Sequence, residues 1–349
     1  MSQIQLRPGY EISRVIRGGW QLAGGHGVID RQTAAADLAA FYDAGITAFD
    51  CADIYTGVEE LIGDFRAEYL KDHGADALAA LKVHTKFVPD LDILPTISRA
   101  HVRRVIDQSL HRLRMERLDL VQYHWWDYDI PGCVETALWL TDLQQDGKID
   151  LIGATNFDTS HTLALLAAGV PLVSAQVQYS LLDARAERSL VKACQEHDVH
   201  LLCYGTVAGG FLSDRWLGEP EPSPPFENRS LTKYKLIIDD FGGWPLFQKL
   251  LRALRRIADR HGADISTVAS AAMLDRRQVA AVIIGARNRS HLAANLAIMQ
   301  LRLTAEDHRE IGAVLSERWI PNGDTFFLER DRAGRHGSIM KYNLNKQAI

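Results

Sequence analysis

The sequence comprises 349 residues, of which 47% are hydrophobic and 24% are charged, as is typical of a globular protein with a large core. Its formal net charge of −5 gives no reason to expect a nucleic acid or an anionic membrane as a partner. The N-terminal segment lacks the apolar stretch of a signal peptide, and VAAVIIGA (279–286) is too short to span a bilayer, so we expect a cytoplasmic protein without a membrane partner.

Short apolar runs alternate with longer amphipathic runs along most of the chain. In chain order, the expected strands are 46–50, 81–86, 118–124, 149–156, 172–178, 200–205 and 279–286, with an eighth strand near 298–303. The expected helices are 31–45, 97–113, 133–148, 186–198 and 247–262. The segment ISRVIRGGWQLAG (12–24) is expected to form a short strand or hairpin that closes the bottom of a barrel. Repeated strand–helix units predict a parallel sheet.

Two stretches interrupt this alternation. Residues 213–245 are rich in Pro and Gly and are longer than an ordinary connection, which is typical of a functional or a disordered loop. The tail, 320–349, has no clear period but contains several aromatic residues, so we expect part of it to dock on the protein. No hinge-like linker occurs, and we expect one domain over 1–349, with the barrel from about 12 to 318.

The four cysteines are scattered along the chain and show no paired ligand spacing. They are Cys51, Cys133, Cys194 and Cys203. This pattern indicates reduced thiols. No metal site is predicted either, because His124 and Asp127 lack a convincing third ligand.

Polar residues stand at the end of nearly every expected strand. In chain order they are Asp50, Lys86, His124, Thr155 with Asn156, Gln176, Tyr204, and Gly285 with Arg287. In a (β/α)8 barrel the carboxyl ends of all strands meet on one face, where active sites of that fold are built. An open sheet would spread the same residues along a line. The pattern therefore favours a closed (β/α)8 TIM barrel.

Each of these residues also has a purely structural interpretation. Asp50 suits the N-cap of the following helix, Lys86 a solvated position, and His124 or Tyr204 a place in the core. The functional interpretation depends on their co-location, with Tyr55 on the first loop.

Four of these side chains, those of Tyr55, Lys86, Asp50 and His124, would act together in proton transfer. A free phenol titrates near ~10, and a neighbouring ammonium such as Lys86 favours its phenolate and lowers that pKa. Asp50 would hold the lysine charged, and His124 would donate a hydrogen bond to an oxygen bound near Tyr55. Such a set suits protonation of a carbonyl oxygen as a hydride reaches its carbon, or the reverse reaction.

Seven segments, taken in order, resemble the motifs of the aldo-keto reductase superfamily. They are ITAFDCADIYTGVEELIG, HTKF, DLVQYHW, GATNF, AQVQYSLL, CYGTVAGGFL and VIIGARNRSHLAANL. The resemblance implies a (β/α)8 barrel and an NADP(H)-dependent carbonyl reductase or alcohol dehydrogenase. It also implies that Tyr55 is the general acid, that Lys86 tunes it, that Asp50 is the partner of the lysine, and that His124 orients the carbonyl.

The same resemblance implies the cofactor contacts. Thr155, Asn156 and Gln176 would bind the nicotinamide carboxamide, and Tyr204 would stack on the ring. Gly18, Gly19 and Trp20 resemble the first active-site turn of the family. The remaining contacts would be Gly205, Thr206, Gly210 and Leu212 at the pyrophosphate, and Gly285, Arg287, Arg289, His291 and Asn295 towards the adenosine. Backbone N–H groups of a Gly-rich loop can cradle phosphates. No G-x-G-x-x-G motif follows a strand, so a Rossmann domain is not expected.

The sequence departs from the family pattern in places that bear on specificity. Thr56 follows Tyr55 where a glycine is usual, and two tryptophans follow His124 where a proline often stands. Trp20, Trp125 and Trp126, with the tail, would form the apolar walls of the substrate pocket. The adenosine end lacks the usual proline and some charged groups, so the preference for NADP(H) rests on the arginines, which can grip a phosphate, and NAD(H) is the alternative.

Other classes of function stay open at this stage. A cofactor-binding regulatory subunit of a membrane channel can retain the same four catalytic residues, and measurable turnover would separate it from an enzyme. A Schiff-base aldolase would use Lys86 as the nucleophile, although pairing with Asp50 opposes this. The substrate is expected to be a small aldehyde, ketone or sugar, and the tail is a candidate contact in a homo-oligomer.

Overall fold

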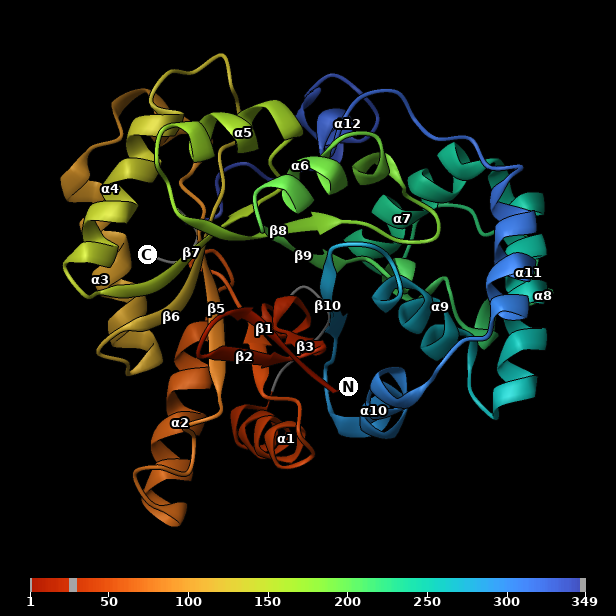
Figure 1. Ribbon diagram of the computed structural model, residues 1–349, viewed down its shortest axis with the longest axis horizontal. Coiled ribbons are helices and arrows are strands. Elements are labelled where there is room, and N and C mark those ends of the chain that lie inside the picture. The colour runs from red at the N-terminus through yellow and green to blue at the C-terminus, as the bar shows by residue number, and fades with distance from the viewer. Residues whose placement is uncertain (1, 25–29, 346–349) are drawn as a thin grey trace.

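A closed barrel of eight parallel strands forms the centre of the protein (Figure 1). The computed structural model describes residues 2–24 and 30–345. Its barrel strands are β3 (Val15–Gly18), β4 (Ala48–Asp50), β5 (Lys82–Phe87), β6 (Leu118–Tyr123), β7 (Ile149–Thr155), β8 (Leu172–Gln178), β9 (His200–Tyr204) and β10 (Val279–Gly285). Helices lie between the strands around the barrel, so the predicted (β/α)8 barrel is confirmed.

The strand that closes the barrel lies near the N-terminus, so the prediction of an eighth strand near 298–303 is wrong. β3 pairs with β4 on one side and with β10 on the other, with Gly18 opposite both Asp50 and Gly285. Residues Leu292–Gln300 form the helix α10, and its buried residues Asn295, Ile298 and Met299 recur at helical spacing. Residues 298–300 of the predicted strand belong to this helix and 301–303 to the loop after it. A short apolar run does not by itself distinguish helical from strand periodicity.

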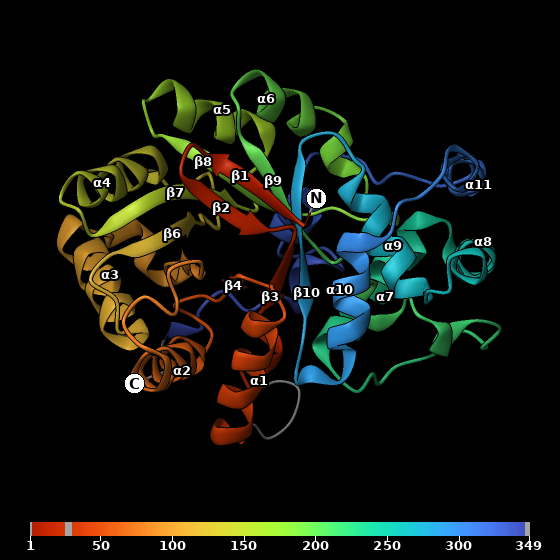
Figure 2. The same ribbon diagram turned by 60° about the horizontal axis from the view of Figure 1, so that its bottom comes forward.

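The N-terminal hairpin covers one end of the barrel, as Figure 2 shows. It consists of β1 (Gln3–Arg7) and β2 (Tyr10–Ser13), which pair antiparallel. Leu6, Tyr10 and Ile12 are buried against residues inside the barrel strands. A hairpin therefore closes the bottom, but it is formed by residues 3–13 and not by the predicted segment 12–24, most of which forms the barrel strand β3 and the turn after it. The carboxyl ends of the strands stay open for a site.

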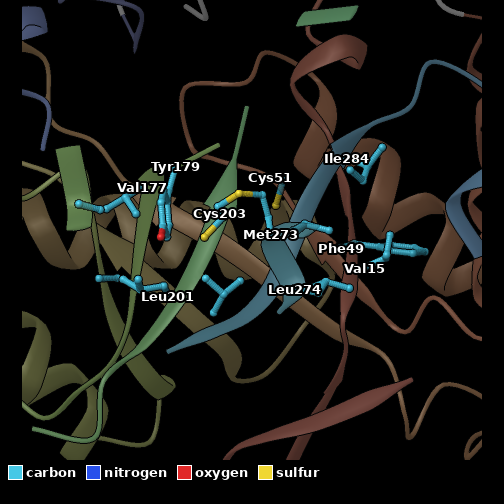
Figure 3. Packing of buried hydrophobic residues seen from close by; sticks show 14 of the residues in the cluster. Val15, Phe49, Cys51, Val177, Tyr179, Leu201, Cys203, Met273, Leu274 and Ile284 are labelled. Carbon is cyan, nitrogen blue, oxygen red and sulfur yellow. The ribbon is translucent and has the colours of Figure 1, made fainter. Parts of the chain in front are cut away.

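Helices surround the barrel. They are α1 (Arg31–Asp43), α2 (Val58–His73), α3 (Arg99–Leu113), α4 (Cys133–Gln145), α5 (Thr159–Ala167), α6 (Leu190–Glu196), α7 (Arg229–Phe241), α8 (Gly243–His261), α9 (Ile265–Leu274), α10 and α11 (Ala305–Leu315). Several, such as α4 and α9, pack directly on the strands of the barrel, while α8 and α11 form an outer layer in which they pack on each other (Figure 1). The five predicted helices correspond to α1, α3, α4, α6 and α8. Figure 3 shows part of this outer core, in which Met273 and Leu274 of α9 lie with Cys203 of β9 and Ile284 of β10.

The segment 213–245, predicted to be one long loop, contains the helix α7. Asn228 caps it by accepting a hydrogen bond from the Leu231 N–H at 3.1 Å. Leu231, Tyr234, Ile237, Ile238 and Phe241 are buried at helical spacing. The part before Asn228 is irregular apart from one 3-10 turn (Asp214–Trp216), and α7 packs over the Gly-rich turn after β9.

The tail docks at the carboxyl end of the barrel, as predicted for part of it. The short helix α12 (Phe327–Arg330) places Glu329 in a buried ion pair with Arg185, with Nη1 to Oε2 at 2.8 Å. Farther along, the Tyr342 carbonyl accepts a hydrogen bond from the Leu91 N–H at 2.9 Å. Residues 346–349 of the predicted tail lie outside the described residues. No helix among the described residues is long and apolar enough to cross a membrane.

Candidate active site

A cavity of about 280 Å³ opens where the strands of the barrel end. All four predicted catalytic residues line it. Asp50 ends β4, Lys86 is the fifth residue of β5, and His124 directly follows β6. Tyr55 lies in the turn between β4 and α2. Four side chains separated by up to 74 positions in the sequence are thus brought to one cavity.

Asp50 and Lys86 form a buried ion pair on the floor of the cavity. The Lys86 Nζ lies 2.6 Å from the Asp50 Oδ2, and both side chains are 5% exposed. The lysine also donates to the Cys51 carbonyl at 2.7 Å. Burial opposes the charge of Lys86, but Asp50 outweighs it and the pKa of Lys86 is raised. Lys86 is therefore a fixed cation, which argues against a Schiff-base nucleophile.

Two glutamines complete the shell of the Asp50 carboxylate. Gln122 and Gln176 donate to Oδ1 at 3.1 Å and 2.6 Å. Gln122 was not among the predicted site residues. The alternation of strand β6 carried the signal, because Gln122 lies two positions before His124 and therefore faces the same side of the strand.

Tyr55 lies directly beside the lysine cation. The Lys86 Nζ is 4.9 Å from the centroid of the Tyr55 ring, and the Trp20 ring packs against Tyr55 edge-on with centroids 5.1 Å apart. Burial raises the pKa of the Tyr55 phenol, and Lys86 acts in the opposite direction. The lysine has the predicted effect, but burial outweighs it in this structure. Tyr55 is thus a neutral phenol that is able to donate a proton.

His124 presents an acceptor nitrogen to the site. Its Nδ1 lies 2.9 Å from the Thr155 carbonyl oxygen, and a carbonyl can only accept, so the ring proton is on Nδ1. Burial, with the Arg330 cation, lowers the pKa of His124 to about 3, so the ring is neutral. Nε2 is buried and has no hydrogen-bond partner among the described residues. The predicted donation from His124 to a carbonyl would need a second ring proton, whereas acceptance from a hydroxyl needs none.

The predicted cofactor residues divide between the cavity and its surroundings. Trp20, Thr155, Asn156, Gln176, Tyr204, Gly205 and Gly285 line the cavity. Gly19, Thr206, Gly210, Leu212, Arg287, Arg289, His291 and Asn295 do not. Thr206 and Leu212 are buried in the core, while Arg287 and His291 are exposed after β10. Arg289 is also exposed, and its Nε lies 3.6 Å from the Asp37 Oδ1.

Helix α7 contributes basic residues to the cavity that were not predicted. Arg229 and Lys233 line it, beside Gly205 and Gly209. The Lys233 Nζ is 5.0 Å from the centroid of the Tyr204 ring, and within residues 2–24 and 30–345 the carboxylates of Glu329 and Asp183 act on it through space without forming a direct ion pair. Burial lowers the pKa of Lys233. An unpaired, partly desolvated cation at this place suits an anionic ligand.

The other wall of the cavity is largely apolar and is completed by the tail. Trp20, Trp126, Phe326, Met340 and Leu344 line it, together with Lys341. Trp125, which was predicted to line the substrate pocket, does not do so. Its ring is fully buried against Tyr123 with centroids 6.2 Å apart, and its Nε1 donates to the Ile130 carbonyl at 3.2 Å. Successive residues at the end of a strand point to opposite faces, so only one of the two tryptophans reaches the cavity.

The cavity has the features of a small-molecule site, with apolar walls and a few fixed polar groups. No group of three metal-ligating side chains occurs in the part of the chain that the structure describes. The arrangement offers a neutral phenol beside a fixed cation, a neutral imidazole, and a set of amides and cations for a ligand.

Comparisons with known proteins agree with this fold. The sequence model of the Aldo/keto reductase family matches residues 14–316. Aldo-keto reductase YhdN of Bacillus subtilis (strain 168) is 28% identical over 314 residues, which cover 88% of this chain and 91% of the relative. The NADH-specific methylglyoxal reductase of Escherichia coli (strain K12) is 24% identical over 322 residues, covering 85% of this chain and 92% of the relative.

A solved structure shows the same architecture. The glycerol dehydrogenase of Gluconobacter oxydans superposes with a TM-score of 0.77 at 23% identity, covering 93% of this chain and 98% of that one. The fold and the family match agree over nearly the whole barrel. The chain therefore belongs to the aldo/keto reductase family, whose members are oxidoreductases that act on small molecules.

Proposed function

We propose that the protein transfers a hydride between NADP(H) and a carbonyl or hydroxyl carbon of an aldehyde, a ketone or a sugar. The observation that carries this proposal is the buried Asp50–Lys86 pair beside the neutral phenol of Tyr55. Such a pair has no evident structural need at the mouth of a barrel, because burying two charges costs free energy that a hydrophobic pair would not.

The residues present fit a nicotinamide dinucleotide. The aromatic face of Tyr204 suits stacking on a flat ring, and its hydroxyl donates to the Asn156 Oδ1 at 2.8 Å, which orients that amide. The Nε2 of Gln176 is bound to Asp50, so a carboxamide would meet the Gln176 carbonyl. Lys233 and Arg229, with the Gly205–Gly209 turn, suit a diphosphate. When bound, the cofactor supplies or accepts the hydride.

The protein residues would manage the proton that accompanies the hydride. In reduction, the Tyr55 hydroxyl donates its proton to the carbonyl oxygen as negative charge develops there. Lys86, held by Asp50, stabilises the phenolate that remains. The His124 Nε2 accepts a hydrogen bond from the hydroxyl of the alcohol. In oxidation the same groups act in reverse order.

The choice of NADP(H) rests on the arginines beyond β10. Arg287 and Arg289 are exposed at the rim, where a guanidinium can bind a 2′-phosphate through two hydrogen bonds. His291 and Asn295 lie on the following turn and helix. Asp37 lies beside Arg289 and competes with a phosphate for it, which favours NAD(H) as the alternative.

A fluorescence titration followed by a turnover assay tests the proposal. Trp20 and Trp126 line the cavity, so saturable quenching of tryptophan fluorescence is expected on addition of NADPH, with much weaker quenching by NADH. Oxidation of bound NADPH on addition of an aldehyde would establish an enzyme. Quenching without turnover across aldehydes, ketones and sugars would instead indicate a cofactor-binding regulatory protein. Absence of quenching by either nucleotide would overturn the proposal.

A further inference from the structure

The side chain of Arg330, on the C-terminal tail, joins two loops at the mouth of the barrel. Its Nη1 donates to the carbonyl oxygens of Trp125 at 2.5 Å and Trp126 at 2.6 Å. Its Nη2 donates to the Asn156 carbonyl at 2.8 Å and to the Tyr128 hydroxyl at 2.7 Å. One guanidinium thus holds the segment after β6 against the segment after β7.

These two segments carry residues that the proposed reaction uses. His124 immediately precedes the two tryptophans, and its Nδ1 donates across to the Thr155 carbonyl, so the imidazole spans the same two segments. Asn156 has a left-handed backbone with φ of 61°, a conformation that asparagine tolerates but does not favour. The hydrogen bond from Arg330 to its carbonyl fixes this backbone, while its side chain accepts from Tyr204.

Arg330 is itself held firmly by aromatic rings. Its guanidinium carbon lies 3.8 Å from the centroid of the Tyr128 ring and 5.5 Å from that of Phe326. The Phe326 ring packs edge-on against His124, with centroids 5.6 Å apart. Stacking on an aromatic face and a planar fork of donors are properties of arginine that lysine does not reproduce. The contacts therefore specify both the charge and the shape of this side chain.

The charge of Arg330 also acts on His124. Among the described residues it is the one charged side chain whose effect on the imidazole is resolved, since Asp50 and Lys86 on β4 and β5 pair with each other and Asp127 on the loop after β6 pairs with Arg332 at 3.2 Å. The neighbouring rings of Trp126 and Phe326 carry no charge. Burial is the larger cause of the lowered pKa of His124 and the Arg330 cation adds to it, so both oppose protonation of Nε2.

We propose that Arg330 is a positioning residue, which holds His124 as a hydrogen-bond acceptor towards the substrate and sets Asn156 for the cofactor. This role rests on the proposed oxidoreductase function. A positioning role differs from a contribution of Arg330 to stability alone, because positioning requires that the protonation of His124 depends on the guanidinium.

Three variants separate these possibilities. Arg330→Met removes the charge and all the donors, Arg330→Lys keeps the charge but cannot satisfy the same acceptors, and Arg309→Met removes an exposed arginine of helix α11 as the control. The pH profile of kcat/KM and the ¹⁵N NMR signals of the His124 ring, assigned with His124→Gln, are measured for each. The NMR signals report the tautomer and the protonation without any need for turnover.

The wild type and Arg309→Met are expected to show a neutral His124 with its proton on Nδ1 throughout the pH range in which the protein is folded. Arg330→Met is expected to lose about 100-fold in kcat/KM, to show an acidic limb that moves up in pH, and to show His124 titrating nearer its ordinary pKa of ~6.5. Arg330→Lys is expected to keep the acidic limb of the wild type with an intermediate loss of kcat/KM. If Arg330→Met does not fold, the proposal is judged on Arg330→Lys alone: an acidic limb like that of the wild type, together with a lower kcat/KM, supports it, and any other result overturns it.

A His124 signal and an acidic limb that do not change in Arg330→Met would overturn the positioning role. An acidic limb that moves equally in Arg330→Lys and Arg330→Met would overturn the role of the charge. Failure of the oxidoreductase proposal gives a different result, namely no turnover in the wild type and the control, and the NMR measurement would still test the effect of Arg330 on His124.

Discussion

The ion pair between Glu329 and Arg185 is expected to hold the tail on the barrel, and the substitution Glu329→Gln tests this. Both side chains are almost fully buried, and Arg185 Nη1 and Nη2 donate to the two oxygens of Glu329 at 2.8 Å and 2.9 Å. Burial opposes the charge of Glu329, but Arg185 outweighs it and lowers the pKa of Glu329 to about 2. Glutamine has nearly the same shape and lacks the charge, so it isolates the electrostatic contribution.

The expected magnitude follows from this pKa. The difference between about 2 and the ordinary value near ~4.3 corresponds to about 3 kcal/mol in favour of the charged form. Because the folded pKa is depressed, this stabilisation is complete above about pH 5 and is lost as the pH falls towards about 2. At pH 3 about half of it should remain. Removal of one partner of a buried pair has a cost of similar size, roughly 3–5 kcal/mol.

Urea unfolding, followed by tryptophan fluorescence, measures the difference between wild type and Glu329→Gln at pH 7 and again at pH 3. Glu116→Gln, at an exposed position, is the control. Limited proteolysis reports whether the tail detaches before the barrel unfolds. Equal unfolding free energies of wild type and variant at pH 7 would refute the reasoning. A difference that stays constant between pH 7 and pH 3 would also refute it, because the contribution would then not come from the charge.

Three further substitutions test the site. Tyr55→Phe is expected to lower kcat about 10²- to 10⁴-fold while the affinity for the dinucleotide, measured by fluorescence quenching, is retained; unchanged kcat would remove Tyr55 from the proton transfer. Lys233→Met is expected to raise the Kd for NADPH about tenfold and to weaken its dependence on salt, whereas the exposed Lys192→Met should have no effect on titration curves. Lys341→Glu, at an exposed position on the cavity wall, is expected to lower kcat/KM for 4-carboxybenzaldehyde about fivefold relative to benzaldehyde, and an unchanged ratio would show that Lys341 does not meet the substrate.

The sequence alone determined the barrel and the place of the four proposed catalytic residues in it, because both depend on short-range patterns. The alternation of apolar runs with amphipathic runs predicted the parallel strands from β4 to β10. The residues at the ends of those strands converge on one face in any closed barrel, so Asp50, Lys86 and His124 could be assigned before their distances were known. Tyr55 was assigned from the segment ITAFDCADIYTGVEELIG, which also contains Asp50.

Tertiary structure decided those features that depend on neighbours distant in the sequence. Strand β3 has only four residues, and nothing in that run distinguishes a barrel strand from a hairpin until β10 pairs with it. The net pKa of Tyr55 depends on how deeply it is buried, which no local pattern reports. The neutral ring of His124 depends on its burial and on a carbonyl of the next strand, and Arg330, which adds to the effect of burial, lies 206 positions later in the sequence.

The walls of the cavity likewise depend on tertiary contacts that the local sequence does not report. Trp125 and Trp126 are equivalent in the sequence, and only the direction of the chain after β6 turns the first into the core and the second into the cavity. The tail has no periodic pattern because its contacts are individual side-chain hydrogen bonds and ion pairs with the barrel, such as those of Glu329 and Arg330. Local sequence patterns report periodic burial, so they predict a barrel and its strand ends, whereas single long-range contacts become visible only when the chain is folded.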